Sequence, residues 1–370
     1  MRVGIIGGGQ LGRMLALAAY PLGIEVRTLE PAADAPAGRL TEQIVAAYDD
    51  QEALASFAAG LDLVTYEFEN VPVESAAFLA ERLPVHPAPR ALEVAQDRLH
   101  EKTFFRSLGI PTPRFAPVAS LTELRRAATE IGLPAILKTR RLGYDGKGQS
   151  VITREADVDV AWAELGGEPL ILEERLDFDR ELSVLAARST SGEFACYPLV
   201  ENHHRGGILR LSLAPAPDLD PALSEQAEAL ARHVLEEVGY AGLLAIELFE
   251  RGGDLFANEM APRVHNSGHW TIEGAETSQF EQHLRGILGL PLGSTAPRGH
   301  SAMINLIGEL PPIEPILALR GAHLHLYQKA PRPGRKLGHV TLCAGEPAEL
   351  QRLLQSVTAL VPEVPARSLI

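Results

Sequence analysis

The chain has 370 residues and a formal net charge of −14, with 46% apolar and 22% charged residues and only two cysteines. This length predicts two or three domains, and the acidic balance argues against a nucleic-acid binder, which needs a basic face. Because the sequence has no disulfide framework, no secretory leader at its start and no apolar run of the roughly 20 residues that span a bilayer, we expect a cytoplasmic protein that binds neither nucleic acid nor membrane.

The first 95 residues alternate apolar strands with helices. We expect strands at Val3–Ile6, Glu25–Leu29 and Leu61–Tyr66, and helices at Arg13–Tyr20 and Gln51–Ala59. This βαβ pattern predicts a parallel sheet with helices on its faces. Three prolines between residues 84 and 89 then indicate a domain boundary.

The middle of the chain changes to short strands around two longer helices. The helices are expected at about Asp97–Leu108 and Pro221–Val238. The apolar strands are expected at Ala135–Leu137, Leu170–Leu172, Leu182–Ala186 and Leu243–Phe249. This mixture predicts an α+β region of mostly antiparallel sheet. The last segment is expected to hold strands near His323–Tyr327 and His339–Leu342 and a helix near Pro347–Ala359.

A glycine-rich turn, Gly7–Gly12, fits the pattern G-x-G-x-x-G between a strand and a helix. Such a turn presents free N–H groups and the positive end of a helix dipole to a phosphate. Glu30 lies 18 residues beyond Gly12, where an acid that binds a ribose is expected. Three interpretations remain open: a dinucleotide site, a site for a single phosphate, and a turn that only permits close packing.

Two apolar strands, Leu243–Phe249 and Leu255–Met260, flank the turn signal Gly252-Gly253. If the turn is centred on Gly253, Glu247 and Glu259 lie opposite one another, with Cβ atoms roughly 4.5–5.5 Å apart. Two carboxylates this close repel each other, and a divalent cation offsets that repulsion. The alternative is that both acids simply face water.

A lysine at the end of a strand, Lys138, precedes a loop with glycines at positions 143, 146 and 148. A lysine there can meet a nucleotide phosphate, and the loop can cover the phosphates with its N–H groups. The strand Leu170–Leu172 then ends in Glu173 and Glu174, where the backbone can read an adenine edge. The alternative for the loop is a plain solvent-exposed hairpin.

Four motifs turn these features into a family resemblance: Gly8–Met14, Gly143–Gln149, Asn258–Trp270 and Pro333–His339. Together with the lysine, the glycine loop and the pair of acids, they resemble the ATP-grasp superfamily and, within it, the N5-carboxyaminoimidazole ribonucleotide synthetases of purine biosynthesis. The motifs are spread over the whole chain, and Arg263–Trp270 is the most specific of them.

The resemblance implies a three-domain ATP-grasp architecture of α/β and α+β class. An N-terminal Rossmann-like domain would span residues 1–95, the ATP-grasp region 96–294 with a lid at about 112–176, and a small α+β domain 295–370. It also implies carboxylation of 5-aminoimidazole ribonucleotide with bicarbonate, through carboxyphosphate, with release of ADP and phosphate. ATP and Mg²⁺, or Mn²⁺ in its place, would be required, and a homodimer is the expected assembly.

The same resemblance implies roles for individual residues. The expected catalytic residues are Lys138, Asp145, Arg263 and His265. The expected metal ligands are Glu247 and Glu259. The expected ATP-binding residues are Arg98, Lys138, Gly143, Tyr144, Asp145, Gly146, Lys147, Gly148, Gln149, Glu173, Glu174, Arg175, Leu176, Glu181, His204, Asn258 and Glu259. The expected contacts of the aminoimidazole nucleotide are Gln10, Leu11, Glu69, Tyr144, Asp145, Arg263, His265, Asn266, Lys329, Arg335 and Lys336.

Several alternatives compete with this interpretation. Asp145 is the expected proton acceptor, but it would serve equally to hydrogen-bond the substrate or to cap its loop. The interpretation as a nicotinamide-dependent oxidoreductase rests on the glycine turn and Glu30. Another alternative is a regulatory module that binds ATP without turning it over. The nearest rival is a formate-dependent glycinamide ribonucleotide transformylase of the same superfamily. A zinc site at His265 and His269 is disfavoured, because the intervening Ser-Gly pair does not suit a regular helix.

Overall fold

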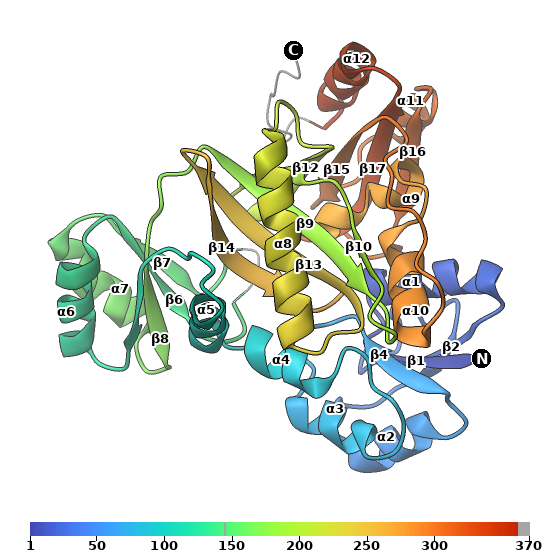
Figure 1. Ribbon diagram of the computed structural model, residues 1–370, viewed down its shortest axis with the longest axis horizontal. Helices are drawn as coiled ribbons and strands as arrows, with labels where there is room; N and C mark the ends of the chain where they lie inside the picture. The colour runs from blue at the N-terminus through green and yellow to red at the C-terminus, as the bar shows by residue number, and fades with distance from the viewer. Residues whose placement is uncertain (144–145, 362–370) are drawn as a thin grey trace.

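The computed structural model describes residues 1–143 and 146–361, which form three sheets with helices packed on them (Figure 1). Tyr144 and Asp145, and residues 362–370, lie outside the described part of the chain. Within the described ranges, no helix combines the length and the apolar character that a membrane span requires.

The N-terminal sheet has four parallel strands in the order β3-β2-β1-β4, which confirms the expected parallel sheet. Its strands are β1 (Arg2–Ile6), β2 (Glu25–Leu29), β3 (Glu42–Ile44) and β4 (Leu63–Tyr66). The accompanying helices are α1 (Gln10–Ala19), the short η1 (Tyr20–Leu22), α2 (Gln51–Ala58) and α3 (Val73–Ala80). Helix α1 begins three residues earlier than expected, because Gly9 is its N-cap and Gly12 lies inside its first turns.

Two consecutive helices, α4 (Pro89–Ala95) and α5 (Arg98–Ser107), lead into a separate lobe, the lid, drawn in green in Figure 1. Its antiparallel sheet has the order β5-β8-β6-β7. The elements of the lid are β5 (Phe115–Val118), α6 (Leu121–Ile131), β6 (Ala135–Thr139), β7 (Gln149–Ile152), η2 (Glu155–Asp157), α7 (Val158–Leu165) and β8 (Leu170–Glu174). The lid has its own apolar core, which includes Leu124, Leu137 and Leu172, all fully buried.

A nine-stranded sheet forms the body, in the order β14-β13-β9-β11-β12-β15-β17-β16, with β10 also paired to β9. Its first six strands are β9 (Arg180–Arg188), β10 (Phe194–Cys196), β11 (Val200–Arg205), β12 (Ile208–Ala214), β13 (Gly242–Arg251) and β14 (Asp254–Ala261). The helices of this segment are α8 (Pro221–Glu237), η3 (Asn266–Gly268), α9 (Thr271–Gly274) and α10 (Gln279–Leu288).

The two faces of this sheet are buried against different layers. Alternate residues of one strand point to opposite faces, so Leu243 and Ala245 join the core with α1 and α10, whereas Leu244 and Ile246 join the core with α8. The near-continuous apolar run of β13 is therefore explained by burial on both sides.

The C-terminal segment adds its strands to the same sheet. They are β15 (His300–Ile307), β16 (Ala322–Leu326) and β17 (Lys336–Ala344), with helices α11 (Ile313–Leu317) and α12 (Pro347–Thr358) beside them. β15 pairs with β12, and β17 pairs with β15, both antiparallel. The expected boundary between residues 294 and 295 therefore divides the sequence but not the sheet, because long-range strand pairing crosses it.

The hairpin of β13 and β14 differs from expectation in its turn. Arg251 pairs with Asp254, so the turn consists of Gly252 and Gly253, both with positive φ, and is not centred on Gly253. A β-bulge then adds Asn258 to β14, and the register beyond it pairs Glu247 with Glu259. The expected pairing of the two acids is confirmed, but the assumed turn was wrong and the bulge compensates for it.

The separate core of the lid leads to a stability prediction. Leu172→Ala should destabilise the lid by about 2–5 kcal/mol, as expected when a buried leucine is truncated. The chain has two tryptophans, Trp162 against the lid core and Trp270 within the core of the body. In a Trp270→Phe background, urea unfolding followed by Trp162 fluorescence should show the lowered midpoint. In a Trp162→Phe background, Trp270 should report a smaller change; equal shifts would mean that lid and body unfold as one unit.

Candidate active site

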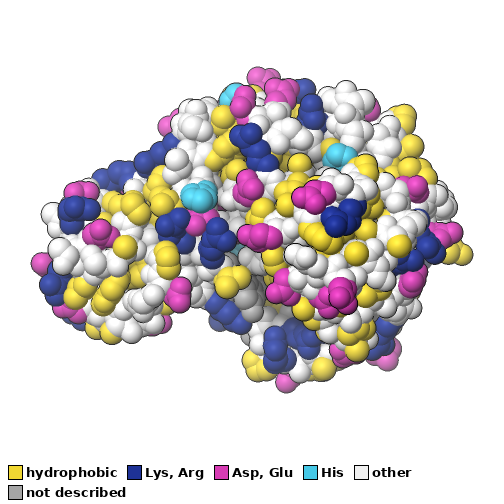
Figure 2. All heavy atoms as spheres, turned by 90° about the horizontal axis from the view of Figure 1, so that it is seen from below, with side chains coloured by type: hydrophobic (Ala, Val, Ile, Leu, Met, Phe, Trp, Pro, Cys, Tyr) yellow, Lys and Arg dark blue, Asp and Glu magenta, His cyan; other side chains and the backbone are white. Residues whose placement is uncertain are grey.

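A cavity of about 850 Å³ lies where the lid, the nine-stranded sheet and the N-terminal segment meet. The expected site residues that line it are Gln10, Leu11, Glu69, Arg98, Lys138, Gly143, Gly146, Lys147, Gln149, Glu173, Glu174, Arg175, Leu176, Glu181, His204, Glu247, Asn258, Glu259, Arg263, His265, Asn266 and Lys336. Gly148, Lys329 and Arg335 are not among the lining residues. Figure 2 shows the lid as a separate lobe at the left, with acidic and basic side chains mixed over the visible face.

One face of the body sheet changes character along its strands. At one end, Leu243 and Ala245 of β13 pack in the apolar core. Two residues further on, Glu247 lies on the same face by the alternation of the strand and lines the cavity. On the neighbouring strand β9, Ser183 pairs with Glu247 and Glu181 pairs with Phe249. A single sheet face therefore provides apolar packing at one end and the polar floor of the cavity at the other.

The paired acids Glu247 and Glu259 have different environments. Burial, and then the charge of Glu259, raise the pKa of Glu247. Burial also opposes ionisation of Glu259, but the Arg98 guanidinium, 2.7 Å from its carboxylate, outweighs that cost and lowers its pKa. Because one acid has a cationic partner and the other faces a carboxylate, the pair favours a further positive charge between them.

The residues at this pair fit a magnesium ion that is shared with a ligand. No group of three or more His, Cys, Asp or Glu side chains among the described residues is arranged to hold a metal. Mg²⁺, however, typically takes only one or two carboxylates and completes its shell with phosphate oxygens and water. Beside the pair, the buried Oδ1 atom of Asn258 has no hydrogen-bond partner among the described residues, which leaves one more oxygen of the type that hard cations prefer.

Three buried charges form a chain at the wall of the cavity that Lys138 lines. Lys138 donates to Glu173 over 2.9 Å, and Lys102 of α5 lies 3.2 Å from the same carboxylate oxygen. Burial opposes ionisation of Glu173, but Lys102 and Lys138 lower its pKa to about 2. Burial is also the main cause that lowers the pKa of Lys138. The Glu173 side chain thus orients Lys138.

The opposite wall holds groups that suit a nucleoside. Nδ1 of His204 hydrogen-bonds the Glu181 carboxylate, and this contact helps to raise the pKa of His204 against the opposing effect of burial. Phe178 and Phe249 stack with ring centroids 4.7 Å apart and line the same region. Aromatic rings and a carboxylate are features that suit a base and its ribose.

A second polar cluster lies where β14 leads into η3. Arg263 forms an ion pair with Glu69, which follows β4, and so joins the body to the N-terminal sheet. The Ser267 N–H donates to Nδ1 of His265, which leaves the ring proton on Nε2, 3.5 Å from Glu247. Burial, and then the charge of Arg263, lower the pKa of His265 to about 3, so its imidazole is neutral at pH 7.

Asn266 of the same cluster is held by a reciprocal amide pair. It donates to Asn305 over 3.0 Å and accepts from it over 2.6 Å. Asn305 is on β15, so the C-terminal part of the sheet fixes the orientation of Asn266.

The glycine-rich turn has acids as its partners. Glu67 accepts from the N–H groups of Gly9 and Gly12, and Glu30 accepts from the Gly8 N–H at 3.0 Å. A Cβ atom on Gly7 would lie 2.5 Å from Glu67, so the glycines make room for that carboxylate. The dinucleotide interpretation is wrong, because a pyrophosphate would need these N–H groups and they already donate to the two carboxylates.

Two N–H groups at the start of α1 remain for a single phosphate. Within the described chain, the amides of Gln10 and Leu11 donate no hydrogen bond, and both residues line the cavity. Lys329 bonds the side chain of Gln10, and Lys336 also lines the cavity. Arg335 instead donates to the Ala330 carbonyl at 3.2 Å and shapes the loop that brings Lys329 and Lys336 to the site.

Three protein families match successive parts of the chain: the ribonucleotide synthetase preATP-grasp domain over residues 1–96, the ATP-grasp domain over 103–280 and the phosphoribosylaminoimidazole carboxylase C-terminal domain over 301–353. A curated N5-carboxyaminoimidazole ribonucleotide synthase from Pseudomonas aeruginosa is 55% identical over 361 residues, which cover 98% of this chain and 99% of that protein. This chain belongs to the N5-carboxyaminoimidazole ribonucleotide synthase family.

Solved structures of the synthase family share the whole fold. The N5-carboxyaminoimidazole ribonucleotide synthetase of Thermus thermophilus superimposes with a TM-score of 0.96 at 58% identity, over 99% of this chain and 100% of that chain. The synthase of Aspergillus clavatus, in complex with ADP and 5-aminoimidazole ribonucleotide, gives a TM-score of 0.92 at 32% identity, over 98% of this chain and 99% of that chain.

Sequence reasoning missed three side chains of this synthase-family site. Lys102 sits one turn after Arg98, and that spacing was its only signal. Glu67 lies two residues before Glu69, just after the same strand, and that position was the signal it carried. Phe178 carries no pattern of its own, because its partner Phe249 is 71 residues away. Tyr144 and Asp145, by contrast, were expected at the site but lie outside the described residues.

The histidines considered for zinc have protein partners. Nδ1 of His269 contacts the Gln279 amide at 3.1 Å, and η3 separates it from His265. Outside that pair, His325 of β16 hydrogen-bonds the Glu273 carboxylate at 2.7 Å and stacks on His339.

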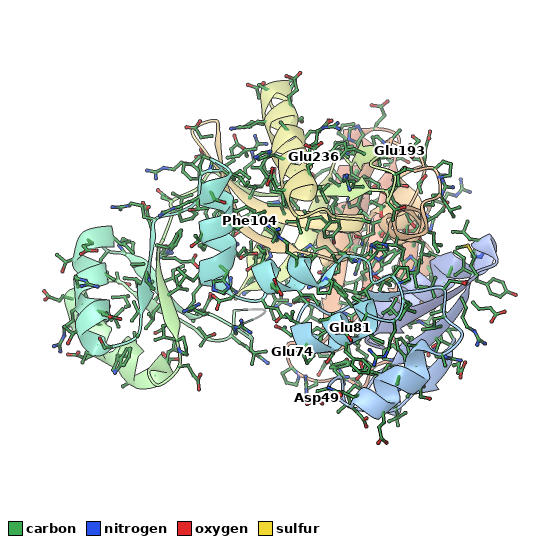
Figure 3. All side chains as sticks on the ribbon, turned by 60° about the horizontal axis from the view of Figure 1, so that its bottom comes forward. Asp49, Glu74, Glu81, Phe104, Glu193 and Glu236 are labelled. Carbon is green, nitrogen blue, oxygen red and sulfur yellow. The ribbon has the colours of Figure 1, made fainter. Side chains whose placement is uncertain are left out.

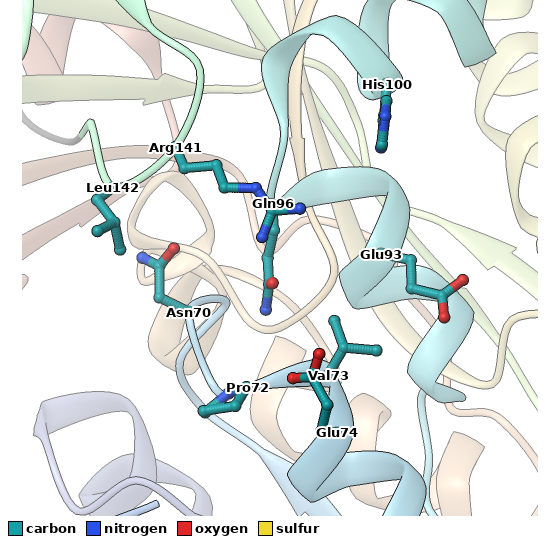
Figure 4. Close-up of a pocket in the computed structure, with 9 residues that line it drawn as sticks. All are labelled: Asn70, Pro72, Val73, Glu74, Glu93, Gln96, His100, Arg141 and Leu142. Carbon is teal, nitrogen blue, oxygen red and sulfur yellow. The ribbon is translucent and has the colours of Figure 1, made fainter. Parts of the chain in front are cut away.

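A second cavity, of about 530 Å³, lies beside the loop that carries Glu69 (Figure 4). Its lining residues are Asn70, Pro72, Val73, Glu74, Glu93, Gln96, His100, Arg141 and Leu142. Gln96 donates to the carbonyls of Glu69 and Val71 at 2.8 and 2.6 Å. This cavity contains none of the expected site residues, and the Gln96 side chain at its wall holds the loop that carries Glu69.

The environment of Lys329 predicts a pH dependence of stability. Burial, and then the charges of Arg335 and Lys336, lower its pKa from 10.5 to about 8, against the opposing effect of Glu67. Between pH 8 and 10.5 the unfolded chain therefore holds a proton that the folded chain has lost, and this group makes stability rise with pH by at most about 1.4 kcal/mol per pH unit. Urea unfolding of the wild type and of Lys329→Met should show this slope only in the wild type. Parallel slopes would contradict the assignment.

Proposed function

We propose that this protein catalyses the ATP-dependent carboxylation of 5-aminoimidazole ribonucleotide with bicarbonate, giving N5-carboxyaminoimidazole ribonucleotide, ADP and phosphate in purine biosynthesis. The observation that carries the proposal is one cavity of about 850 Å³ that runs from Lys138 and the Glu247–Glu259 pair to Gln10 and Leu11. Residues from all three segments of the chain line it, so a nucleotide triphosphate and a nucleotide monophosphate can meet within it.

On the triphosphate side, the roles follow from charge and burial. Lys138 and Arg98 provide positive charge for the phosphates, and Gly143 and Gly146 of the glycine loop line the same cavity. Mg²⁺, when bound at Glu247 and Glu259, would neutralise charge that develops on the transferred phosphoryl group. The segment Glu174–Leu176 would receive the base, and Glu181 with His204 the ribose.

On the carboxylation side, bicarbonate oxygen attacks the γ-phosphorus and carboxyphosphate results. Arg263 would bind the negatively charged group of bicarbonate or carboxyphosphate, and the neutral His265 would donate a hydrogen bond from its Nε2. The phosphate of the aminoimidazole nucleotide would bind the Gln10 and Leu11 amides with Lys329 and Lys336, while Glu69 and Asn266 contact its sugar or ring. Enclosure by the lid keeps water from carboxyphosphate. Asp145, with Tyr144 beside it, completes the proposal as the acceptor of the amine proton.

The proposal is tested by coupled phosphate release. Purified protein should hydrolyse ATP only when both bicarbonate and 5-aminoimidazole ribonucleotide are present, and the carboxylated product should appear in equal amount. Asp145→Asn should lose carboxylation more than ATP binding. Turnover with formate and glycinamide ribonucleotide instead would assign the protein to the rival ligase, and reduction of a nicotinamide cofactor would refute both. Gel filtration of the same sample should show the expected homodimer.

The metal role predicts the effect of Glu259→Gln. The amide keeps the size of the side chain but removes one of the two negative charges, so turnover with Mg²⁺ or Mn²⁺ should fall about 100-fold, the scale of losing one charge-stabilising contact. The unfolding midpoint should change little. Glu281→Gln is a suitable control, because Glu281 pairs with Arg285 on α10 and neither residue lines the cavity. Full activity of Glu259→Gln would refute the metal assignment.

A further inference from the structure

The opposition of Glu247 and Glu259 depends on the β-bulge of β14. Leu248 pairs with Ala257, so a regular ladder would place Asn258 opposite Glu247 and Glu259 opposite Ile246. A shift of one residue also turns a side chain to the other face of a sheet. Without the bulge, Glu259 would therefore point toward the α8 side, away from the cavity.

A bulge in this place needs support from outside the sheet. β14 is the last strand of the sheet, so one of its edges has no neighbouring strand. A bulge also leaves backbone groups without ladder partners, and buried backbone groups need partners. The Ala257 N–H donates to the Pro111 carbonyl at 2.8 Å, which covers the edge before the bulge.

Two consecutive residues of α5 provide the remaining partners, one on each side of Glu259. The Lys102 ammonium donates to the carbonyl of Asn258 at 3.0 Å. The Glu101 carboxylate accepts from the N–H of Met260 at 2.6 Å. Arg98, one turn earlier on the same helix face, binds the Glu259 carboxylate itself. Figure 3 shows α5, marked by Phe104, between the lid and the body.

Stability alone does not explain why these two buried positions carry ionisable side chains. Glu101 is 2% exposed and Lys102 is fully buried. Burying charged groups carries a large desolvation cost, and apolar residues of similar volume often stabilise such a position better. Their common feature is that each bonds a backbone atom next to Glu259.

We propose that Glu101 and Lys102 are positioning residues that hold the bulge of β14 and thereby keep Glu259 opposite Glu247. The inference rests on the proposed metal role of these two acids. Since the contacts are to backbone atoms, the reach of the Glu101 side chain matters more than its charge. Lys102 also bonds Glu173, so the same helix links the bulge to the lysine of the lid.

Direct metal binding tests the proposal without turnover. Mn²⁺ binding to the full chain in the presence of ADP is measured by electron paramagnetic resonance of free Mn²⁺. Glu101→Asp keeps the charge but withdraws the acceptor from the Met260 N–H, and Mn²⁺ should bind about tenfold more weakly, the low end of losses behind a metal ligand. Glu101→Gln keeps the acceptor within reach and should bind Mn²⁺ like the wild type. Lys102→Met, which removes the donor to Asn258, should weaken Mn²⁺ binding as Glu101→Asp does.

The matched control is Glu250→Asp, which shortens a buried carboxylate on the same hairpin, three residues along β13 from Glu247 and in an ion pair with Arg180. It should leave Mn²⁺ affinity unchanged. Hydrogen exchange of residues 255–261 should be faster in Glu101→Asp and Lys102→Met than in Glu250→Asp and the wild type, which shows a loosened bulge even if the affinity change is small.

Four outcomes would overturn the proposal. Wild-type affinity and exchange in Glu101→Asp would remove the positioning role, and so would weak binding in Glu101→Gln with normal binding in Glu101→Asp, which would indicate an effect of charge. If the wild type fails to bind Mn²⁺, or if Glu259→Gln binds it equally well, the metal assignment itself fails and the inference falls with it.

Discussion

The site depends on two carboxylates held face to face in a largely apolar sheet. Such a pair is costly, and the structure offsets the cost with cations placed on other elements: Arg98 on α5 and, further along the same cavity, Lys138 on the lid. Each strong cation also has an acid partner, Glu259 for Arg98, Glu173 for Lys138 and Glu69 for Arg263. The cavity is thus a set of paired charges, and an incoming polyanion would exchange one partner for another.

Local pattern was sufficient to predict most elements and the two acids, but not the way in which the acids meet. The pairing of Glu247 with Glu259 was inferred from a three-residue turn, whereas the chain uses a two-residue turn and a bulge. Nothing near Asn258 in the sequence signals that bulge, because the groups that hold it, Glu101 and Lys102, come from a helix more than 150 residues earlier. The attachment of the third segment to the body sheet carried no sequence signal for a similar reason, since the pairing of β15 with β12 is a long-range contact.

The glycine turn shows how one pattern permits several chemistries. Its spacing alone left three interpretations open, and the decision came from Glu67, an acid at the end of the neighbouring parallel strand. A parallel pairing between β1 and β4 brings that carboxylate to the start of α1. The sequence shows that Glu67 is present but not where its side chain points. It therefore could not predict that this carboxylate accepts from the N–H groups at the start of α1.

The continuous body sheet has a consequence for the architecture of the chain. Because β15 is hydrogen-bonded along β12, a version of the chain that stopped before residue 300 would not be a smaller nucleotide-binding unit. It would leave Leu211 and Leu213 on a long unprotected strand edge, the kind of surface that recruits other chains. The C-terminal segment therefore covers an edge of the body sheet and also lines the cavity. Removing it by truncation would expose that edge and favour aggregation instead of giving a functional fragment.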